Sequence, residues 1–365
     1  MVYLLIFSFL IFFIFLEINI DLKIKLKSEY YLLFIFINII LVFVAGFRSV
    51  GFDYENYLDI YNTVRLSNFI ENGIEIGFAY LITAFNSIGL PFFIFTFFIA
   101  LISISLKSSF FNKHSEYPFL SLLIYFSITY LISDMGQMRN GLAFAIALWA
   151  FSDLFENKNK LFFLKISLAF IIHSSAIILF PVYFLLKIKR FKPVIMAFII
   201  MTLFYFVFFD IKSIILFFSE KLSFSQLESR VALYVLADDG SAPLGLNLSL
   251  FLRLLIITVM IIYYDSGINR FKYYDKFIRL YFYGICLYMI FNSVNEFAFR
   301  FSNYFKILEC VILPMFVSMG KTRWDKNFIA FLIILYCSYS IFKILFDPIF
   351  GTVYLPYKNV FADFF

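Results

Sequence analysis

Several charged side chains that could bind a phosphate group lie beside or inside long apolar stretches of this chain. They are the arginines Arg48, Arg139, Arg253 and Arg300, and the histidine His173 lies in a similar setting. Ionisable groups inside a membrane are costly and usually serve a function. Arginine forms bidentate, permanently charged hydrogen bonds with phosphate groups, and fixed cations stabilise a leaving pyrophosphate. These residues therefore predict a site that binds a lipid-linked phosphate or pyrophosphate.

Three residues are candidates for the base that would activate an attacking hydroxyl group. His173 is the first choice, because an ordinary imidazole titrates near neutral pH. Asp53 and Glu75 are the reserves, because both lie in a polar segment that could close over an acceptor. Each also has a structural interpretation: Ser174 could satisfy a buried His173. Asp53 could be a turn residue, and Glu75 could cap the helix that follows it.

The arginines have structural interpretations of their own. Arg48 and Arg139 could anchor helix ends by extending their charged groups to the membrane interface. Arg300 could pair with Glu296, one helical turn earlier. Arg253 is the hardest to explain in this way, because apolar residues surround it on both sides.

The composition identifies the setting of these residues as a membrane. Of the 365 residues, 63% are hydrophobic and only 15% are charged, and the mean hydropathy is +0.92. A soluble protein of this size does not carry so much apolar surface. The net charge of +6 comes from short basic clusters between apolar runs, the pattern of the positive-inside rule. It does not indicate a nucleic-acid partner.

The basic clusters predict the topology. Each cluster marks a cytoplasmic loop, and Lys107 is assigned to one of these loops. The apolar runs between them predict an all-α polytopic integral membrane protein, with about ten to twelve transmembrane helices and re-entrant pieces, forming a single domain over residues 1–365. The predicted external segments are the loops 48–75, 134–140 and 210–242 and the C-terminal tail 347–365.

Two breaks in the apolar runs are predicted from local sequence. Gly89-Leu90-Pro91 divides a short piece, 76–88, from a full crossing that begins at Pro91. The run 161–186 lies between two basic loops and is too short to cross twice. We therefore expect a re-entrant hairpin with its tip at His173-Ser174-Ser175.

Cofactor motifs are not found in the sequence. It has no Walker or Rossmann glycine pattern and no external Asp-x-Asp pair. His173 has no nearby histidine, and the cysteines Cys286, Cys310 and Cys337 are isolated inside apolar runs. We therefore expect no cofactor, no metal and no disulfide.

Five short motifs resemble a known family, the EpsG-like branch of the Wzy-type O-antigen and capsule polymerases. They are residues 45–57 (AGFRSVGFDYENY), 75–78 (EIGF), 139–143 (RNGLA), 170–176 (FIIHSSA) and 300–305 (RFSNYF). Their order and spacing span the chain from Arg48 to Phe305, which is most of its length. The one departure is Asn140, where the family pattern has Gln after the arginine.

The resemblance implies a GT-C-like glycosyltransferase of the bacterial inner membrane that works at the periplasmic face. Such an enzyme transfers a growing glycan from undecaprenyl pyrophosphate onto another lipid-linked repeat unit. It implies a Wzz-type chain-length regulator as a partner and no nucleotide sugar.

Three alternatives remain open at the level of sequence. An O-antigen ligase would share the donor, but it usually carries a larger periplasmic loop than 210–242. A lipid-linked oligosaccharide flippase or another transporter would show repeated halves and polar groups near the bilayer middle. A membrane acyltransferase built around His173 would need a second acidic or histidine partner at fixed spacing.

Overall fold

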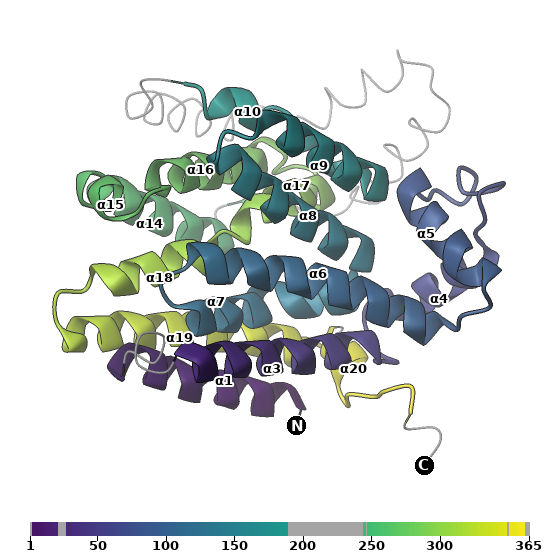
Figure 1. The fold of residues 1–365 in the computed structure, drawn as a ribbon, viewed down its shortest axis with the longest axis horizontal. Coiled ribbons are helices and arrows are strands. Elements are labelled where there is room, and N and C mark those ends of the chain that lie inside the picture. The colour runs from purple at the N-terminus through teal and green to yellow at the C-terminus, as the bar shows by residue number, and fades with distance from the viewer. Residues whose placement is uncertain (1, 21–26, 189–243, 246, 349, 362–365) are drawn as a thin grey trace. The chain divides into compact units, whose positions relative to one another are not determined.

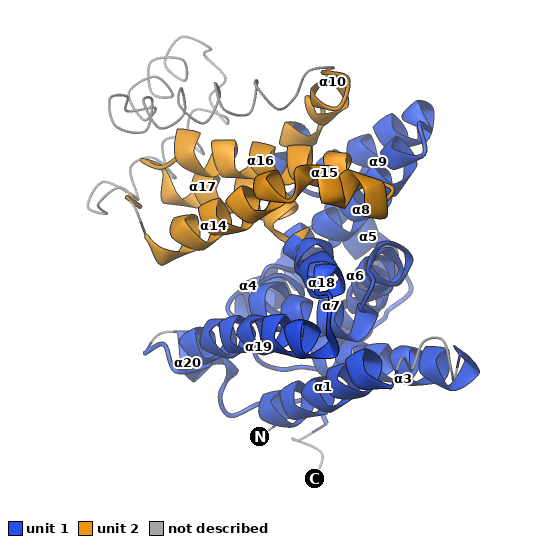
Figure 2. Cartoon of the chain, turned by 90° about the vertical axis from the view of Figure 1, so that its left-hand side faces the viewer, with its two compact units in different colours: residues 1–177, 309–365 blue, residues 178–308 orange. Residues whose placement is uncertain are grey.

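The computed structural model describes the whole chain except residues 1, 21–26, 189–243, 246, 349 and 362–365. The described residues are almost entirely helical (Figure 1). They form two compact units, Met1–Ile177 with Glu309–Phe365 and Ile178–Leu308, which Figure 2 distinguishes by colour.

The first unit contains most of the long helices. They are α1 (Val2–Asn19), α3 (Lys27–Gly46), α4 (Tyr54–Thr63), α5 (Ile76–Ser87), α6 (Phe92–His114), α7 (Pro118–Tyr125), the π-helix η1 (Phe126–Gly136), α8 (Met138–Phe155), α9 (Asn159–Ile172), α18 (Glu309–Met319), α19 (Arg323–Leu345) and α20 (Phe350–Tyr354). Within it α6 packs along both α3 and α8, α8 packs along α9, and α1 packs along α7. The α7–η1 helix forms the core, because nearly all its residues are buried.

The second unit contains shorter helices. They are α10 (Val182–Leu185), α14 (Leu248–Ile262), α15 (Tyr264–Arg270), α16 (Tyr274–Ile290) and α17 (Asn295–Lys306). Here α16 packs against α14, α15 and α17. The 3₁₀ helix η2 (Ser174–Leu179) lies where the chain passes from the first unit into the second.

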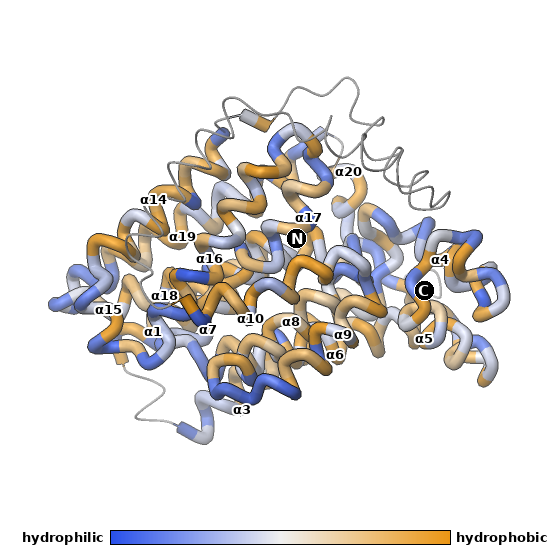
Figure 3. Tube along the Cα trace, turned by 90° about the horizontal axis from the view of Figure 1, so that it is seen from above, coloured by the Kyte–Doolittle hydropathy of each residue, from blue (hydrophilic) through white to orange (hydrophobic). Residues whose placement is uncertain are grey.

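Five helices are long and apolar enough to cross a membrane. They are Val2–Asn19, Lys27–Gly46, Phe92–His114, Pro118–Gly136 and Arg323–Leu345, and two bent helix pairs raise the number to as many as seven in the described part. Figure 3 shows hydrophobic residues along these helices, whereas the segments around α4 and α15 are mostly hydrophilic. The chain is thus a multi-pass helical membrane protein. The prediction of ten to twelve crossings includes Val194–Phe209, and that span and the loop 210–242 lie outside the described residues.

Both predicted breaks are confirmed. The chain leaves α5 at Ser87, turns through Gly89 with a positive φ of 68°, and enters α6 after Pro91. The second break lies at His173, between the end of α9 and the start of η2.

Two segments that the sequence predicts as loops are helical instead. Lys107 is not a loop residue, because α6 continues past it to His114 and buries its side chain completely. Residues 134–140 are not a loop either: Asp134 is buried inside η1, and Arg139 belongs to α8. The physical reason is that Lys107 and Asp134 neutralise each other, so that helices can bury both charges.

Candidate functional site

Glu75 lies at the start of α5, where a close approach to α9 sets its position. A Cβ atom on Gly77 would lie 2.8 Å from the carbonyl oxygen of Ile171, so only glycine permits this packing. Ile171 is the second-last residue of α9, and His173 is the first residue after the helix. The short spacing between Glu75 and Gly77 therefore brings the carboxylate to the end of α9.

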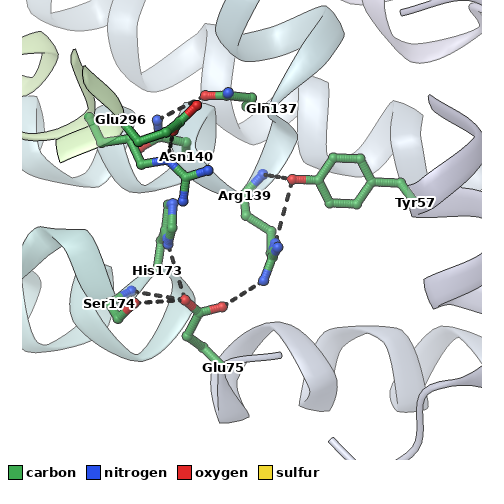
Figure 4. A network of polar contacts seen from close by, with 9 residues as sticks. Tyr57, Glu75, Gln137, Arg139, Asn140, His173, Ser174 and Glu296 are labelled. Carbon is green, nitrogen blue, oxygen red and sulfur yellow. Dashed lines mark hydrogen bonds and ion pairs between the residues drawn. The ribbon is translucent and has the colours of Figure 1, made fainter. Parts of the chain in front are cut away.

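The Glu75 carboxylate joins the arginine and the histidine that the sequence singled out (Figure 4). Its Oε2 accepts a hydrogen bond from Arg139 Nη1 at 2.8 Å. Its Oε1 lies 3.1 Å from His173 Nδ1 and accepts bonds from the backbone N and the Oγ of Ser174, at 3.1 and 3.0 Å. We call these residues, together with Tyr57, the Glu75 network.

Arg139 is held in place from three sides. It lies in the first turn of α8, an unfavourable place for a cation because of the helix dipole. Glu75 offsets that charge. The Tyr57 hydroxyl lies 3.5 Å from Arg139 Nε, and the guanidinium carbon lies 5.7 and 5.9 Å from the ring centres of Tyr57 and Phe78. The Nη2 atom takes no part in these bonds and can bind an anion.

Charge fixes the proton on the histidine ring. Burial acts to raise the pKa of Glu75, but the hydrogen bond from His173 and the charge of Arg139 outweigh it and hold that pKa well below its usual range. An ionised carboxylate can only accept hydrogen bonds, so Nδ1 of His173 carries a proton. In the neutral ring Nε2 is then the nitrogen with a lone pair that can accept a proton.

Arg48 is buried away from these bonds. Arg48 is 1% exposed, and its Nη1 donates a hydrogen bond to the carbonyl of Ala45. Its Nε and Nη2 atoms have no hydrogen-bond partner. Asp53, the reserve base nearby in the sequence, precedes the first residue of α4, where it occupies the predicted turn position. Neither residue takes part in the bonds of the Glu75 network in the described structure.

The other two predicted arginines belong to the second unit. Arg253 lies in α14 and is 2% exposed, and its guanidinium carbon is 4.6 Å from the ring centre of Tyr288. Arg300 pairs with Glu296 at 2.6 Å, as its structural interpretation predicted. A single cavity that all four arginines share stays a prediction.

Sequence reasoning missed two parts of this region. Tyr57 and Ser174 contact Arg139 and Glu75, although their types alone did not set them apart from 25 tyrosines and many serines. The motifs EIGF and FIIHSSA contain Glu75 and Ser174 and could have suggested the contact. Lys107 and Asp134 were assigned to opposite faces of the membrane, which hid their pairing.

The described residues contain no group of three or more His, Cys, Asp or Glu side chains that could hold a metal ion. The cysteines Cys286, Cys310 and Cys337 are buried and unbonded.

The fold and the site thus define a multi-pass helical membrane protein with a carboxylate that joins a guanidinium and an imidazole. The sequence model of the EpsG family matches residues 30–359. The chain therefore belongs to the EpsG family, and this membership suggests a role of the membrane glycosyltransferase or polymerase type. No curated protein and no solved structure gives a significant match.

Proposed function

We propose that this protein is a polysaccharide polymerase of the Wzy type. It transfers an undecaprenyl-pyrophosphate-linked glycan onto another lipid-linked repeat unit at the periplasmic face of the bacterial inner membrane. The observation that carries the proposal is the contact of Glu75 with both Arg139 and His173, because it places a cation and a base beside each other. A base and a fixed cation each accelerate glycosyl transfer from a pyrophosphate.

His173 is the base in this proposal. The acceptor hydroxyl attacks the anomeric carbon of the donor, and its proton passes to His173 Nε2. The bond between the anomeric carbon and the phosphate oxygen breaks, and undecaprenyl pyrophosphate leaves with the electron pair. A positioned base accelerates such a step by typically 10²–10⁴-fold.

Glu75 is a positioning residue rather than a reserve base. Both of its carboxylate oxygens already accept hydrogen bonds, and its lowered pKa makes it a poor proton acceptor. Its role resembles that of the carboxylate that orients the histidine of a hydrolase triad. Asp53 stays the alternative base.

Arg139 binds the pyrophosphate of the donor through the part of its guanidinium that Glu75 leaves free. Because Arg139 neutralises the charge of the leaving pyrophosphate, that group does not have to be protonated by a general acid. Arg48, Arg253 and Arg300 are further candidates for phosphate binding, as the sequence suggests. Arg300 contributes least, because Glu296 already offsets its charge.

The orientation in the membrane can be tested by labelling single cysteines. The helix α8 has 18 residues and is roughly 27 Å long, so Arg139 and the loop after Phe155 lie at opposite ends. Cysteine in place of the exposed Glu71 should react with an impermeant reagent from the periplasm. Cysteine in place of Lys160 should react only after permeabilisation; the reverse pattern would overturn the proposed orientation.

The function itself is tested with purified protein and lipid-linked repeat units. A polymerase produces a ladder of longer lipid-linked glycans and releases undecaprenyl pyrophosphate, also in the presence of a chelator. A ligase requires a lipid A acceptor, and a flippase forms no glycosidic bond. Adding a Wzz-type regulator should narrow the ladder if that protein is a partner.

A further inference from the structure

The C-terminal segment lies across the backbone of Arg48. Residues 354–360, which we call the C-terminal strap, form an isolated antiparallel bridge in which Asn359 is opposite Arg48. The N–H of Ser49 donates to the carbonyl of Lys358 at 3.1 Å, and the N–H of Val360 donates to the carbonyl of Phe47 at 2.9 Å.

Two tyrosine hydroxyls of the strap attach it to helices of the first unit. The Tyr354 hydroxyl donates to the carbonyl of Leu131 at 2.8 Å, and the Tyr357 hydroxyl donates to the carbonyl of Val44 at 3.1 Å. A segment held by one isolated bridge and two side-chain hydrogen bonds has low local stability. The strap can therefore open without unfolding the helices beneath it.

The charge beneath the strap has no anionic partner among the described residues. Arg48 forms no ion pair, and its Nε and Nη2 atoms make no hydrogen bond. Lys107, which is also fully buried in this unit, pairs with Asp134 at 2.7 Å. Removing a charge from water without such a partner is strongly unfavourable. Arg48 therefore weakens the fold, and a residue that does so is expected at a functional site.

The surroundings of Arg48 suit an anion. The ring of Tyr3 packs edge-on against the ring of Tyr357, 5.9 Å between centres, and Tyr357 belongs to the strap that pairs with the backbone of Arg48. The Tyr3 hydroxyl is also buried without a hydrogen-bond partner. Two free guanidinium N–H directions and a free phenol hydroxyl match the several oxygen acceptors of a phosphate group.

The opposite wall of this region is fixed. Gly51 has a φ of 140°, and a Cβ atom there would lie 2.3 Å from the carbonyl oxygen of Met135. The loop that carries Arg48 is therefore packed tightly against η1, and a residue with a side chain would not fit. This side of Arg48 is therefore closed to an anion.

We propose that Arg48 and the Tyr3 hydroxyl bind a phosphate or pyrophosphate group, and that the C-terminal strap covers this site and opens to admit it. The inference rests on the proposed function only in the expected source of the anion. That source is the pyrophosphate of a lipid-linked glycan or a free inorganic pyrophosphate.

Binding to the full-length protein in zwitterionic nanodiscs tests the site without any turnover. The probes are inorganic pyrophosphate and undecaprenyl pyrophosphate. Arg48→Met should weaken the binding of at least one probe by about 10- to 100-fold, because charge-assisted hydrogen bonds are lost. The matched control is Arg65→Met just after α4, whose guanidinium donates to the carbonyls of Tyr61 and Val64.

The two probes separate the sources. If Arg48→Met weakens the binding of both probes, the anion is the lipid-linked headgroup. If it weakens the binding of inorganic pyrophosphate alone, the anion is free pyrophosphate. Without probe, Arg48→Met should melt at the same or a higher temperature than the unaltered protein, because it removes an uncompensated charge. Unchanged binding of both probes to Arg48→Met would overturn the site. Should that variant fold poorly, Arg48→Lys replaces it, with an intermediate loss expected.

A disulfide tests the strap. Ser49→Cys with Lys358→Cys places two thiols at directly opposed positions, in a background where the three native cysteines are Ala. The oxidised protein should lose probe binding, and reduction should restore it, while either single cysteine variant binds normally. Equal binding by the oxidised and reduced protein would show that the strap does not move. Because no glycan is transferred, these results are independent of whether the polymerase assay succeeds.

Discussion

The Nζ atom of Lys107 lies 2.7 Å from Oδ2 of Asp134, and the two side chains are 0% and 1% exposed. The same carboxylate accepts bonds from Ser103 at 2.5 Å and from Tyr125 at 2.6 Å. These contacts tie α6 to the π-helix η1, which leads directly into the helix that carries Arg139. The ion pair thus fixes the position of the chain just before Arg139.

Breaking this pair should cost more than removing it whole. Asp134→Leu leaves a buried ammonium without a partner and should destabilise the protein by about 3–5 kcal/mol. The double variant Lys107→Met with Asp134→Leu should recover much of that loss, because neither charge remains. Thermal unfolding in detergent measures the stability of the single and of the double variant. A double variant no more stable than Asp134→Leu would mean that the two charges do not interact.

Much of the local structure could be predicted because it depends on nearby residues. The break at Gly89–Pro91, the break at His173 and the Glu296–Arg300 pair all follow from short-range rules. The Lys107–Asp134 pair could not be predicted. Counting basic residues assigns every lysine to a loop, whereas a lysine with a partner can lie inside a helix bundle.

Long-range contacts of the backbone were equally hidden. The strap joins Asn359 to Arg48 through main-chain atoms, and such bonds leave no pattern of residue types. Glu75, Arg139 and His173 were each selected, because charges in apolar surroundings are conspicuous. Their contact depends on how α5, α8 and α9 pack, which periodicity alone does not determine.

The stability that Glu75 provides should depend on pH in a defined direction. Its pKa in the folded protein lies below the ordinary value of 4.5, so its stabilisation is complete above that value and is lost as the pH falls through the folded pKa. Glu75→Gln should therefore lower the melting temperature fully at neutral pH, and the difference should shrink in strong acid. A difference that stays constant from neutral pH to about pH 3 would contradict this linkage.

The close packing of α5 on α9 should be needed for activity. Gly77→Ala places a Cβ atom 2.8 Å from the carbonyl oxygen of Ile171 and must push Glu75 away from His173. A displacement of about 1 Å can lower turnover by roughly 10²-fold. The control is Tyr80→Ala on the same helix, where the side chain is 63% exposed. Equal turnover by the two variants would show that activity does not depend on the close packing of α5 on α9.

Replacing Arg139 should act on the donor. Arg139→Lys keeps a charge but loses the planar fork, so the KM for the lipid-linked donor should rise by about tenfold. The matched control is Arg323→Lys at the exposed start of α19, which should not alter KM. Steady-state kinetics with varied donor concentration distinguish the two, and a KM unchanged in Arg139→Lys would remove Arg139 from donor binding.

The central claim is that the Glu75 network performs glycosyl transfer with His173 as the base. The most direct test is a single-turnover measurement of glycan transfer by purified His173→Gln, with donor binding measured on the same sample. His114→Gln is the matched control, because it alters the only other histidine, whose Nε2 lies 2.9 Å from Ser152 Oγ. We expect His173→Gln to slow transfer by about 10²–10⁴-fold with donor binding nearly unchanged, and His114→Gln to transfer at close to the normal rate. Transfer by His173→Gln at the rate of the unaltered protein would contradict the account and direct attention to Asp53.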